Sequence, residues 1–284
     1  MSRVAYVAGQ YLPHRQAAVH VEDRGFQFAD GVYEVIAVNR GHLVDEMPHL
    51  ARFHRSLGEL RIRAPMGDAA LKIVIREIVR RNGVDTGIVY LQVTRGAAPR
   101  EHAFPKAATP TLVVTARRTR PPDPRLGEDG IKVITIPDIR WQRCDIKSVA
   151  LIPNVLGKQQ ARENGAYEAW QVDGAGQVTE GTSTNAWIVT VDGTVVTRAA
   201  DTAILNGVTR LAIFDIIRRE GYRLDERPFT VAEAKAAREA FLTSTTADLL
   251  PVVRIDGSPV GEGRPGPLAK KLRAAYFAHA EAAA

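Results

Sequence analysis

The most informative stretch of this 284-residue chain reads RCDIKSVALI, residues 143–152, and places Lys147 among apolar neighbours. These residue types predict an extended, strand-like run, in which an ammonium is either a charge at a sheet edge or a buried amine. Burial lowers the pKa of an amine by desolvation and makes the amine a nucleophile near neutral pH. Lysines of that kind form Schiff bases with carbonyl compounds, pyridoxal phosphate among them.

An acidic residue, Glu180, follows 33 positions after the lysine, in the stretch TEGTSTN, residues 179–185. A carboxylate that faces a pyridine nitrogen keeps this nitrogen protonated and the ring an electron sink. Lys147 and Glu180 are therefore candidates for a cofactor-bearing amine and its ring partner. A single lysine is usually solvated, so the assignment depends on the segments around it.

The composition is that of an ordinary globular enzyme, because 45% hydrophobic and 25% charged residues suffice to bury a core. The formal charge of +6 comes from scattered bases, the densest cluster being RRTR at residues 117–120. No aromatic-rich basic stretch accompanies this cluster. The pattern argues against nucleic-acid binding and suits anionic substrates and a phosphate cofactor.

The single cysteine, Cys144, leaves no internal disulfide framework, so we expect a reducing compartment. The N-terminal residues lack the apolar core of a signal peptide, and no run approaches the roughly 18 apolar residues that span a bilayer. We therefore expect a cytoplasmic enzyme with no membrane partner. The sequence does not indicate whether Cys144 is reactive.

Strand and helix patterns alternate along the chain and predict an α+β protein in two parts. Pro121, Pro122 and Pro124 cannot continue a helix or a central strand, so we expect domains at residues 1–120 and 121–284. The expected strands are 32–38, 88–95, 111–115, 131–136, 168–172, 185–191, 241–242 and 252–253. The expected helices are 48–60, 68–81, 154–164, 208–220, a short one capped by Thr230, and a last one from Pro267.

Three segments are candidates for binding a phosphate group. The stretch NGVT, residues 206–209, begins a predicted helix, where free N–H groups and the helix dipole favour an anion, although an ordinary N-cap is the alternative. The stretch TSTT, residues 243–246, follows a predicted strand and either wraps phosphate oxygens or forms a polar turn. Arg52 lies off the apolar stripe of its helix and is either a two-donor fork for phosphate or a surface arginine.

A loop with Arg100 and His102 offers donors for a carboxylate. Arginine grips a carboxylate with two planar donors, and the histidine two residues later adds a third. A solvated polar loop is the alternative interpretation. Tyr33 either presents its hydroxyl to the same anion or packs in the core. No dinucleotide fingerprint, Walker-type loop, metal-spaced Cys/His cluster or Gly-x-Ser-x-Gly elbow occurs, so no metal site is expected.

Several ordered blocks resemble the fold-type-IV (class IV) pyridoxal-phosphate aminotransferases, and most closely the bacterial D-amino-acid aminotransferases. The blocks span nearly the whole chain: EDRGFQFADGVYE (22–34), HLAR (49–52), QVTRG (92–96), DIRWQRCDIK (138–147), TEGTSTN (179–185), LNGVTR (205–210) and TSTT (243–246). The resemblance implies a smaller N-terminal α/β domain and a larger C-terminal β-barrel-like α+β domain that carries the lysine. Ala29 departs from the pattern, since relatives often have glycine there; alanine disfavours positive φ.

The resemblance also implies roles for individual residues. Lys147 corresponds to the Schiff-base lysine and proton shuttle, and Glu180 to the partner of the pyridine nitrogen of pyridoxal 5′-phosphate. Leu205 corresponds to an apolar wall against the cofactor ring. The implied phosphate-binding residues are Arg52, Val208 (through its backbone N–H), Thr209, Ser244 and Thr245.

In the D-specific branch, an arginine and a histidine from the neighbouring subunit, with a tyrosine, bind the substrate α-carboxylate. Arg100, His102 and Tyr33 match these residues, which implies a homodimer. The expected activity is transamination between a D-amino acid and a 2-oxo acid, either 2-oxoglutarate or pyruvate. The alternatives on the same fold are a branched-chain L-amino-acid aminotransferase, an (R)-amine transaminase and an aminodeoxychorismate-lyase-like enzyme. A basic, non-catalytic nucleic-acid-binding protein is the alternative of another class.

Overall fold

The computed structural model describes residues 3–120 and 123–282, which form two compact units. Unit 1 comprises Met1–Arg120, Ile146–Ala150 and Ala280–Ala284, and unit 2 comprises Pro121–Asp145 and Leu151–His279. Pro121 and Pro122, the first two prolines of the expected linker, lie outside the described residues.

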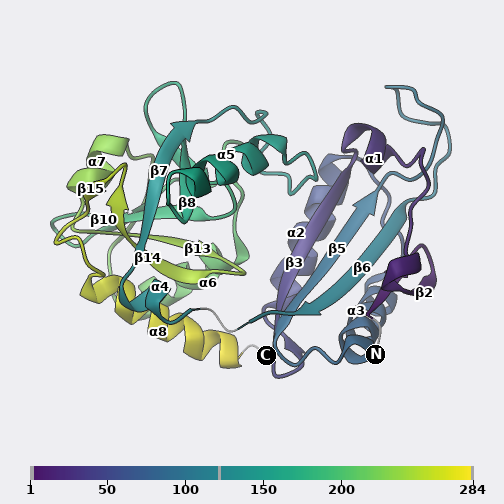
Figure 1. Cartoon of the computed structure of the whole chain (residues 1–284), viewed down its shortest axis with the longest axis horizontal. Helices are drawn as coiled ribbons and strands as arrows, with labels where there is room; N and C mark the ends of the chain where they lie inside the picture. Colours follow the sequence, from purple (N-terminus) through teal and green to yellow (C-terminus); the bar gives the residue numbers. More distant parts are fainter. Residues whose placement is uncertain (1–2, 121–122, 283–284) are drawn as a thin grey trace. The chain divides into compact units, whose positions relative to one another are not determined.

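Unit 1 is built on a six-stranded antiparallel sheet with the order β2-β1-β6-β5-β3-β4 (Figure 1). Its strands are β1 (Val4–Val7), β2 (Gln10–Pro13), β3 (Gly31–Asn39), β4 (His42–Leu43), β5 (Gly87–Thr94) and β6 (Thr111–Arg118). Its α-helices are α1 (Arg24–Phe28), α2 (Glu46–Glu59) and α3 (Asp68–Asn82), and a 3-10 turn, His14–Gln16, follows β2.

Strand β3 buries every second residue against helix α2. The buried positions of the strand are Val32, Glu34, Ile36 and Val38. The apolar residues of α2 recur three or four positions apart and so share one helix face; they are Leu50, Phe53 and Leu57. This packing leaves one carboxylate, that of Glu34, on the buried face, where an ionised group needs a partner.

Unit 2 contains a nine-stranded mixed sheet with the order β12-β11-β10-β13-β14-β7-β8-β9, and β15 pairs with β14. Strand β9, at the end of this path, also approaches β10, so the sheet curls towards closure. The strands are β7 (Ile131–Pro137), β8 (Glu168–Val172), β9 (Val178–Gly181), β10 (Asn185–Val189), β11 (Val195–Thr197), β12 (Leu224–Glu226), β13 (Glu239–Ser244), β14 (Asp248–Ile255) and β15 (Ser258–Pro259). The expected α+β fold class with a barrel-like C-terminal sheet is confirmed.

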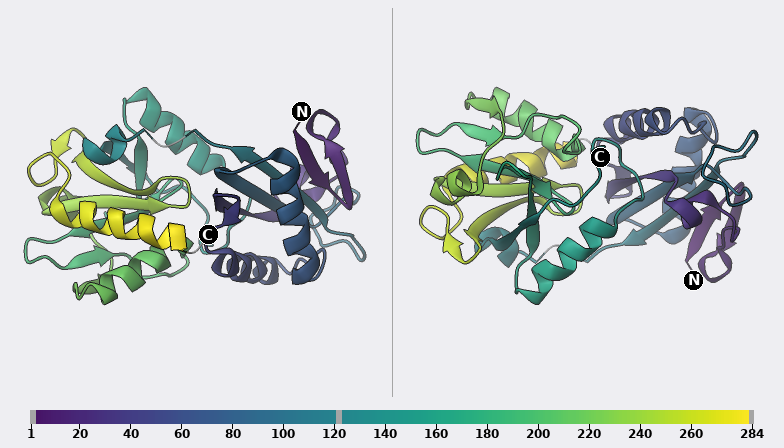
Figure 2. Two further views of the ribbon diagram at one scale, coloured as in Figure 1. Left: turned by 90° about the horizontal axis from the view of Figure 1, so that it is seen from below. Right: turned by 90° about the horizontal axis from the view of Figure 1, so that it is seen from above.

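Five helices accompany the described part of this sheet: α4 (Arg125–Glu128), α5 (Ile152–Glu163), α6 (Val208–Arg219), α7 (Val231–Ala236) and α8 (Pro267–Ala282). Figure 2 shows α8, in yellow, lying along the sheet. Its first turn is fixed by Glu239 of β13, which accepts the N–H groups of Leu268 at 3.1 Å and Ala269 at 2.8 Å. A carboxylate at this position also complements the positive end of the helix dipole.

The lysine segment differs from its sequence-based prediction. Residues 146–150 group with unit 1, whereas the sequence analysis assigned them to the C-terminal domain. They lie along β3, where the N–H of Tyr33 donates to the carbonyl of Lys147 at 3.0 Å and the N–H of Val149 donates to Gly31 at 3.0 Å. Only one isolated bridge forms, between Val32 and Ser148, so the expected strand is wrong. The N–H of Ser148 bonds to the carbonyl of Ile146 at 2.7 Å, and this tight turn interrupts a regular ladder.

The longer elements appear where the periodicity predicted them, including the Thr230 cap, whose side chain accepts the N–H of Glu233. The sequence analysis missed the shorter elements β1, β2, β4, β9, β11, β12, β15, α1 and α4. Most of these have two to five residues, too few to show a period. Helix α4 begins directly after Pro124, the last of the prolines at the expected domain boundary.

Ala29 forms the C-cap of α1 with φ 56° and ψ 28°, the left-handed conformation. A Cβ atom is strained in that region, so we expect Ala29→Gly to raise the free energy of unfolding by about 1 kcal/mol. Urea denaturation measures this change. The matched control is Ala51→Gly, at an exposed position inside α2, which should lower the stability by about 1 kcal/mol. Destabilisation by both variants would contradict the strain at Ala29.

Candidate active site

Lys147 is half-buried and held by the backbone of unit 1. Its N–H donates to the hydroxyl of Ser56, a fully buried residue of α2, at 3.3 Å. Its ammonium lies 4.2 Å from the ring centroid of Tyr33, a cation–π contact. Tyr33 in turn stacks on Tyr90 of β5 with ring centroids 5.6 Å apart. Two predicted site residues, the lysine and the tyrosine, are thus in direct contact.

Arg52 is paired with the buried carboxylate of Glu34. Its Nε donates to one oxygen at 2.7 Å and its Nη2 to the other at 2.9 Å, while His49 lies 2.8 Å from the second oxygen. Burial alone would raise the pKa of Glu34, but the charge and hydrogen bonds of Arg52, with the hydrogen bond from His49, lower it to about 2. Burial lowers the pKa of His49 against the opposing hydrogen bond and charge of Glu34, and the charges of Arg52 and Lys147 lower it further.

This pairing fixes the orientation of the Arg52 guanidinium. A guanidinium has five N–H groups, and Glu34 takes two of them. Arg52 is therefore anchored by β3 and is not the mobile surface arginine of the alternative interpretation.

Arg100 and His102 are exposed and lie in the loop after β5. Both side chains approach Phe28, at the end of α1: the Arg100 guanidinium lies 4.7 Å from its ring centroid and the His102 ring lies 5.4 Å away. The structure therefore gathers the two predicted carboxylate donors around one aromatic ring.

In unit 2, Glu180 is buried at the end of β9, and three donors converge on its carboxylate. Arg140 donates to Oε1 in a short ion pair. The amide of Asn185 and the backbone N–H of Leu205 each donate to Oε2 at 3.1 Å. Two predicted site residues, Glu180 and Leu205, are therefore joined directly, and the orientation of the acid is fixed from both of its oxygens.

Arg140 is shared between two carboxylates, because its Nη2 also donates to Asp138 at 2.7 Å. Burial opposes the charge of this guanidinium, but the hydrogen bond to Asp138 and the charge of Glu180 raise its pKa above the ordinary value. Burial opposes the charge of Asp138 as well, and the bonds from Arg140 and Thr179 lower the pKa of this carboxyl. Arg140 thus bridges two carboxylates, and the fixed carboxylate of Glu180 is the group type that suits a protonated ring nitrogen.

Asn185 connects Glu180 to the first turn of α6. Its amide also donates to the carbonyl of Leu205 at 2.9 Å, and a Cβ added at Gly207 would lie 2.2 Å from its side-chain oxygen. Glycine is thus required at 207 by close approach. It is the N-cap of α6 and provides no side-chain cap for the first N–H groups of the helix, where the helix dipole favours an anion. The role of Val208 towards phosphate stays a prediction.

Thr209 is buried on α6, and its hydroxyl lies 3.4 Å from that of Tyr276 on α8. The structure therefore gives this residue a partner within the protein. Its predicted role towards phosphate stays a prediction.

Ser244 and Thr245 lie where β13 turns into β14, and both are half-buried. The hydroxyl oxygen of Ser244 accepts the N–H of Ala247 at 3.1 Å, so its proton remains able to donate elsewhere. The preceding residue, Thr243, is the cross-strand neighbour of Asn185. The pairing of β10 with β13 thus brings the hydroxyl turn to the same end of the sheet as the Glu180 cluster.

A further buried carboxylate, Glu168 of β8, holds the turn that follows Glu180. It accepts a short hydrogen bond from Thr182, one from Ser183 at 3.0 Å and one from Thr184 at 3.4 Å. A Cβ at Gly181 would lie 2.1 Å from the Thr184 hydroxyl. The hydroxyl-rich turn is therefore oriented inwards as a structural element.

Sequence reasoning missed Arg140, Asp138, Asn185, Glu34 and His49. Glu34 carried a usable signal, since a charged residue at a buried position of an alternating strand requires a partner. Arg140 and Asn185 lay in the quoted blocks, but nothing in their spacing indicates that they meet Glu180. That meeting depends on the strand pairing of unit 2.

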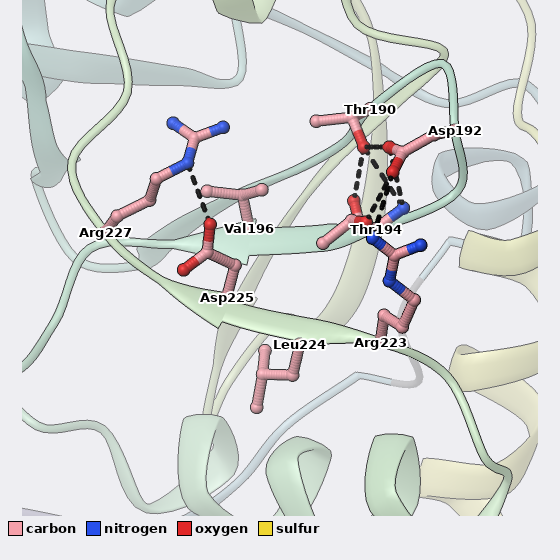
Figure 3. Close-up of a pocket in the computed structure, with 8 residues that line it drawn as sticks. All are labelled: Thr190, Asp192, Thr194, Val196, Arg223, Leu224, Asp225 and Arg227. Carbon is pink, nitrogen blue, oxygen red and sulfur yellow. Dashed lines mark hydrogen bonds and ion pairs between the residues drawn. The ribbon is translucent and has the colours of Figure 1, made fainter.

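A hollow of about 450 Å³ lies elsewhere on unit 2, at the β10–β11 hairpin and the edge strand β12 (Figure 3). Its charged groups pair with one another: Arg227 donates to Asp225 at 2.9 Å, and Arg223 lies 3.5 Å from Asp192. Its lining residues are distinct from the predicted site residues. The charged side chains that line the hollow are engaged in these ion pairs, and we assign no reaction to them.

Comparison with known proteins defines the class. The family model of class IV aminotransferases matches residues 31–255. The chain belongs to this family.

Individual relatives agree with this result. The chain is 40% identical over 267 residues to a D-alanine aminotransferase of Bacillus licheniformis, covering 94% of this chain and 93% of that protein. It is 38% identical over 278 residues to a D-alanine aminotransferase of Staphylococcus haemolyticus, covering 97% of both.

Solved structures show the same fold. A branched-chain amino acid aminotransferase of Escherichia coli superposes with a TM-score of 0.90 at 23% identity, covering 98% of this chain and 94% of that chain. A branched-chain amino acid aminotransferase of T.th. origin, solved with pyridoxamine 5′-phosphate, has a TM-score of 0.89 at 26% identity, covering 99% and 95%.

Among residues 3–120 and 123–282, no group of three or more His, Cys, Asp and Glu side chains is arranged to hold a metal ion. Within the same part of the chain, no helix is long and apolar enough to cross a membrane.

Cys144 is a weak nucleophile in this environment. Burial, aided by the charges of Glu180 and Asp138, raises the pKa of its thiol to about 12 against the opposing charge of Arg140. Because the thiolate is the reactive species, we expect iodoacetamide at pH 8 to label the native protein at least about a hundredfold more slowly than free cysteine, with the rate rising as pH increases. The urea-unfolded chain is the control and should react at the ordinary rate. Fast native labelling would show that Cys144 is activated.

Proposed function

We propose that this protein transfers the amino group between a D-amino acid and a 2-oxo acid with pyridoxal 5′-phosphate as cofactor. One observation carries the choice of substrate: Arg100 and His102 stand together in an exposed loop, in a chain 37–40% identical to D-alanine aminotransferases. An arginine with a neighbouring histidine provides the planar donors that an α-carboxylate requires.

The residues present fit the cofactor. The uncapped N-terminus of α6 at Gly207 and the hydroxyl turn at Ser244 suit a phosphate, and the fixed carboxylate of Glu180 suits a protonated pyridine nitrogen. When bound, the cofactor supplies an aldehyde that condenses with amines and a ring that accepts the electrons of the Cα–H bond. We assign phosphate binding to Arg52, Val208, Thr209, Ser244 and Thr245, and the apolar wall against the ring to Leu205.

Lys147 is the residue assigned to hold the cofactor covalently and to move the substrate proton. Displaced by the amino group of the substrate, Lys147 would be the free amine that takes the proton from Cα and, as the resulting ammonium, the acid that gives a proton back. Its backbone contacts with Tyr33 and Ser56 restrict where this amine can reach. Glu180, fixed by three donors, is the carboxylate that would keep the ring nitrogen protonated when the cofactor is bound.

The handedness of the substrate follows from fixing its carboxylate. Arg100, His102 and the hydroxyl of Tyr33 bind that group, which leaves one enantiomer with its Cα–H directed at Lys147. We propose that Arg100 and His102 act on the active site of the neighbouring subunit of a cytoplasmic homodimer. Large apolar side chains exposed on unit 2 support self-association; they are Ile139, Trp141, Ile152, Val155 and Leu156.

The branched-chain aminotransferases are the alternative, because they share the fold. Their identity of 23–26% is well below that of the D-alanine aminotransferases. An (R)-amine transaminase would leave Arg100 and His102 without a carboxylate to bind. The D-amino-acid activity therefore accounts for more of the observed residues.

A paired-enantiomer assay tests this function. We expect the purified protein with added cofactor to transaminate D-alanine with 2-oxoglutarate at least about a hundredfold faster than L-leucine or L-alanine. Arg100→Ala should raise the KM for D-alanine about ten- to hundredfold, because a hydrogen-bonded charge pair is lost, with cofactor absorbance unchanged. Preference for the L-enantiomer would overturn the assignment, and loss of cofactor from Arg100→Ala would move this residue out of the carboxylate role.

Mixing two variants with complementary defects tests the shared dimer site. Lys147→Ala should lose the borohydride-trappable cofactor, and Arg100→Ala should lose affinity for substrate. In a mixed dimer one site keeps Lys147 and receives Arg100 from the other subunit, so co-refolding equal amounts should restore about a quarter of wild-type activity at low D-alanine concentration. Each variant refolded alone is the control. Activity that stays at the sum of the controls would show that Arg100 serves its own subunit.

A further inference from the structure

A buried arginine outside the predicted site residues, Arg24, holds the loop that carries Arg100 and His102. It is the first residue of α1 and is only 3% exposed. Its Nη1 donates to the carbonyl oxygen of Glu101 at 2.5 Å and its Nη2 to that of His102 at 3.3 Å. One planar guanidinium thus spans two consecutive peptide groups of the loop.

Arg24 is itself fixed by Asp30. Its Nε donates to this carboxylate at 2.8 Å, and Arg95 donates to both carboxylate oxygens at 2.7 and 3.0 Å. Arg95 also donates to the carbonyls of Leu60 and Arg61, which ties the cluster to the end of α2. Burial opposes the charge of Asp30, but the hydrogen bonds from Arg95 and Arg24 lower its pKa below the ordinary value. The anchor therefore stays charged at neutral pH.

The backbone around Arg24 holds the beginning of the same loop. The N–H of Arg24 donates to the carbonyl of Gly96 at 3.0 Å, and the N–H of Ala98 donates to that of Glu22 at 3.2 Å. The loop is thus held at residues 96–98 by main-chain bonds and at 101–102 by a buried side chain. Arg100 lies between these two fixed points.

Phe28, one helical turn after Arg24, is the surface on which the two donor side chains rest. The guanidinium of Arg24 lies 4.8 Å from the centroid of the same ring that Arg100 and His102 approach. Among the described residues, 3–120 and 123–282, no hydrogen bond engages the side-chain nitrogens of Arg100 or His102. The loop backbone is therefore fixed while its polar ends remain available to an anion.

We propose that Arg24 is a positioning residue for the substrate carboxylate, acting with Asp30 and Phe28 to pre-organise Arg100 and His102. This inference rests on the proposed D-amino-acid activity. Misplacing a binding group by about 1 Å can lower the reaction rate about a hundredfold. A loop that becomes ordered only when the substrate binds also lowers the affinity, because the free energy of ordering is subtracted from the binding energy. Arg24 orders the loop in the folded protein, before the substrate binds. Arg24 therefore affects substrates only through the contacts of Arg100 and His102 with their carboxylate.

Arg24→Met in the full-length protein with cofactor is the experiment, because methionine keeps much of the apolar stem and removes every donor. We expect the KM for both D-alanine and 2-oxoglutarate to rise about tenfold or more, with kcat within about threefold and cofactor absorbance unchanged. Hydrogen exchange of amides 100–104 should accelerate. In an Arg100→Ala/His102→Ala background, Arg24→Met should raise the KM no further, because the residues through which it acts are gone.

Arg118→Met is the matched control, since Arg118 also donates to a backbone carbonyl of unit 1, that of Gly83 at 2.8 Å, away from this loop. It should leave the KM unchanged. Arg24→Lys keeps a charge for Asp30 but cannot span two carbonyls, and should give an intermediate KM. Phe28→Leu, which spares the ion pairs, should raise the KM as well.

The outcomes separate this inference from the proposed function. Wild-type protein that does not transaminate D-alanine overturns the proposed function. Active wild-type protein with an unchanged KM in Arg24→Met overturns the positioning role, and so does an equal KM rise in the Arg100→Ala/His102→Ala background. Should Arg24→Met fail to fold, unchanged KM values in both Arg24→Lys and Phe28→Leu overturn it.

Discussion

Four carboxylates around the candidate site are each held by several hydrogen-bond donors, and the orientation of their neighbours depends on those donors. They belong to Glu34, Asp30, Glu180 and Glu168. An ionised carboxylate removed from water costs several kcal/mol unless donors replace the lost hydration. Every such acid therefore dictates where its partners stand, and those partners are the residues that carry or orient the chemistry.

Both units fix a charged side chain by pairing it with a partner of opposite charge, but the group that is fixed differs between them. In unit 1, Glu34 orients Arg52 through two parallel hydrogen bonds, and Asp30 orients Arg24, which holds a loop. In unit 2, the order is reversed: Arg140 and Asn185 orient the acid, Glu180. Removing one partner from such a pair leaves an uncompensated charge, which is more destabilising than losing both. Each pairing thus fixes the direction in which a charged side chain points. A single substitution that removes one partner destabilises the fold.

The family and the fold class were predictable from the sequence, and the contacts within the candidate site that it did not predict have a physical cause. The blocks around Lys147, Glu180 and Gly207 led to the family because each has an unusual combination of residue types in a fixed order. The partners of Glu180 were not predictable, since Arg140 and Leu205 reach it from positions 40 residues before and 25 residues after it. Such meetings are decided by strand pairing, which no local pattern contains.

The segment around Lys147 is a second place where the local sequence pattern did not predict the structure. Its apolar composition predicts burial, but among its apolar residues only Ile146 is buried, and Ile152 is 70% exposed. The type of backbone is not predicted either, because a tight turn at Ser148 leaves the segment with one bridge to β3. The structure nevertheless fixes the Lys147 backbone by bonding it to Tyr33, so a regular strand is not needed to position the amine.

Substrate size explains why so much of the scaffold supports so few contacting atoms. A molecule as small as D-alanine, with about six non-hydrogen atoms, can contribute at most about 9 kcal/mol of binding energy even at the ceiling of about 1.5 kcal/mol per atom. Ordering one free arginine side chain consumes about 2 kcal/mol of that total, and ordering loop backbone consumes about 1–2 kcal/mol per residue. A loop ordered only on binding would therefore leave too little energy to distinguish two enantiomers. Because Arg24 and Asp30 fix the loop backbone in the folded protein, the substrate has to order only the ends of Arg100 and His102. The binding energy of the carboxylate contacts then remains available to discriminate between the two enantiomers.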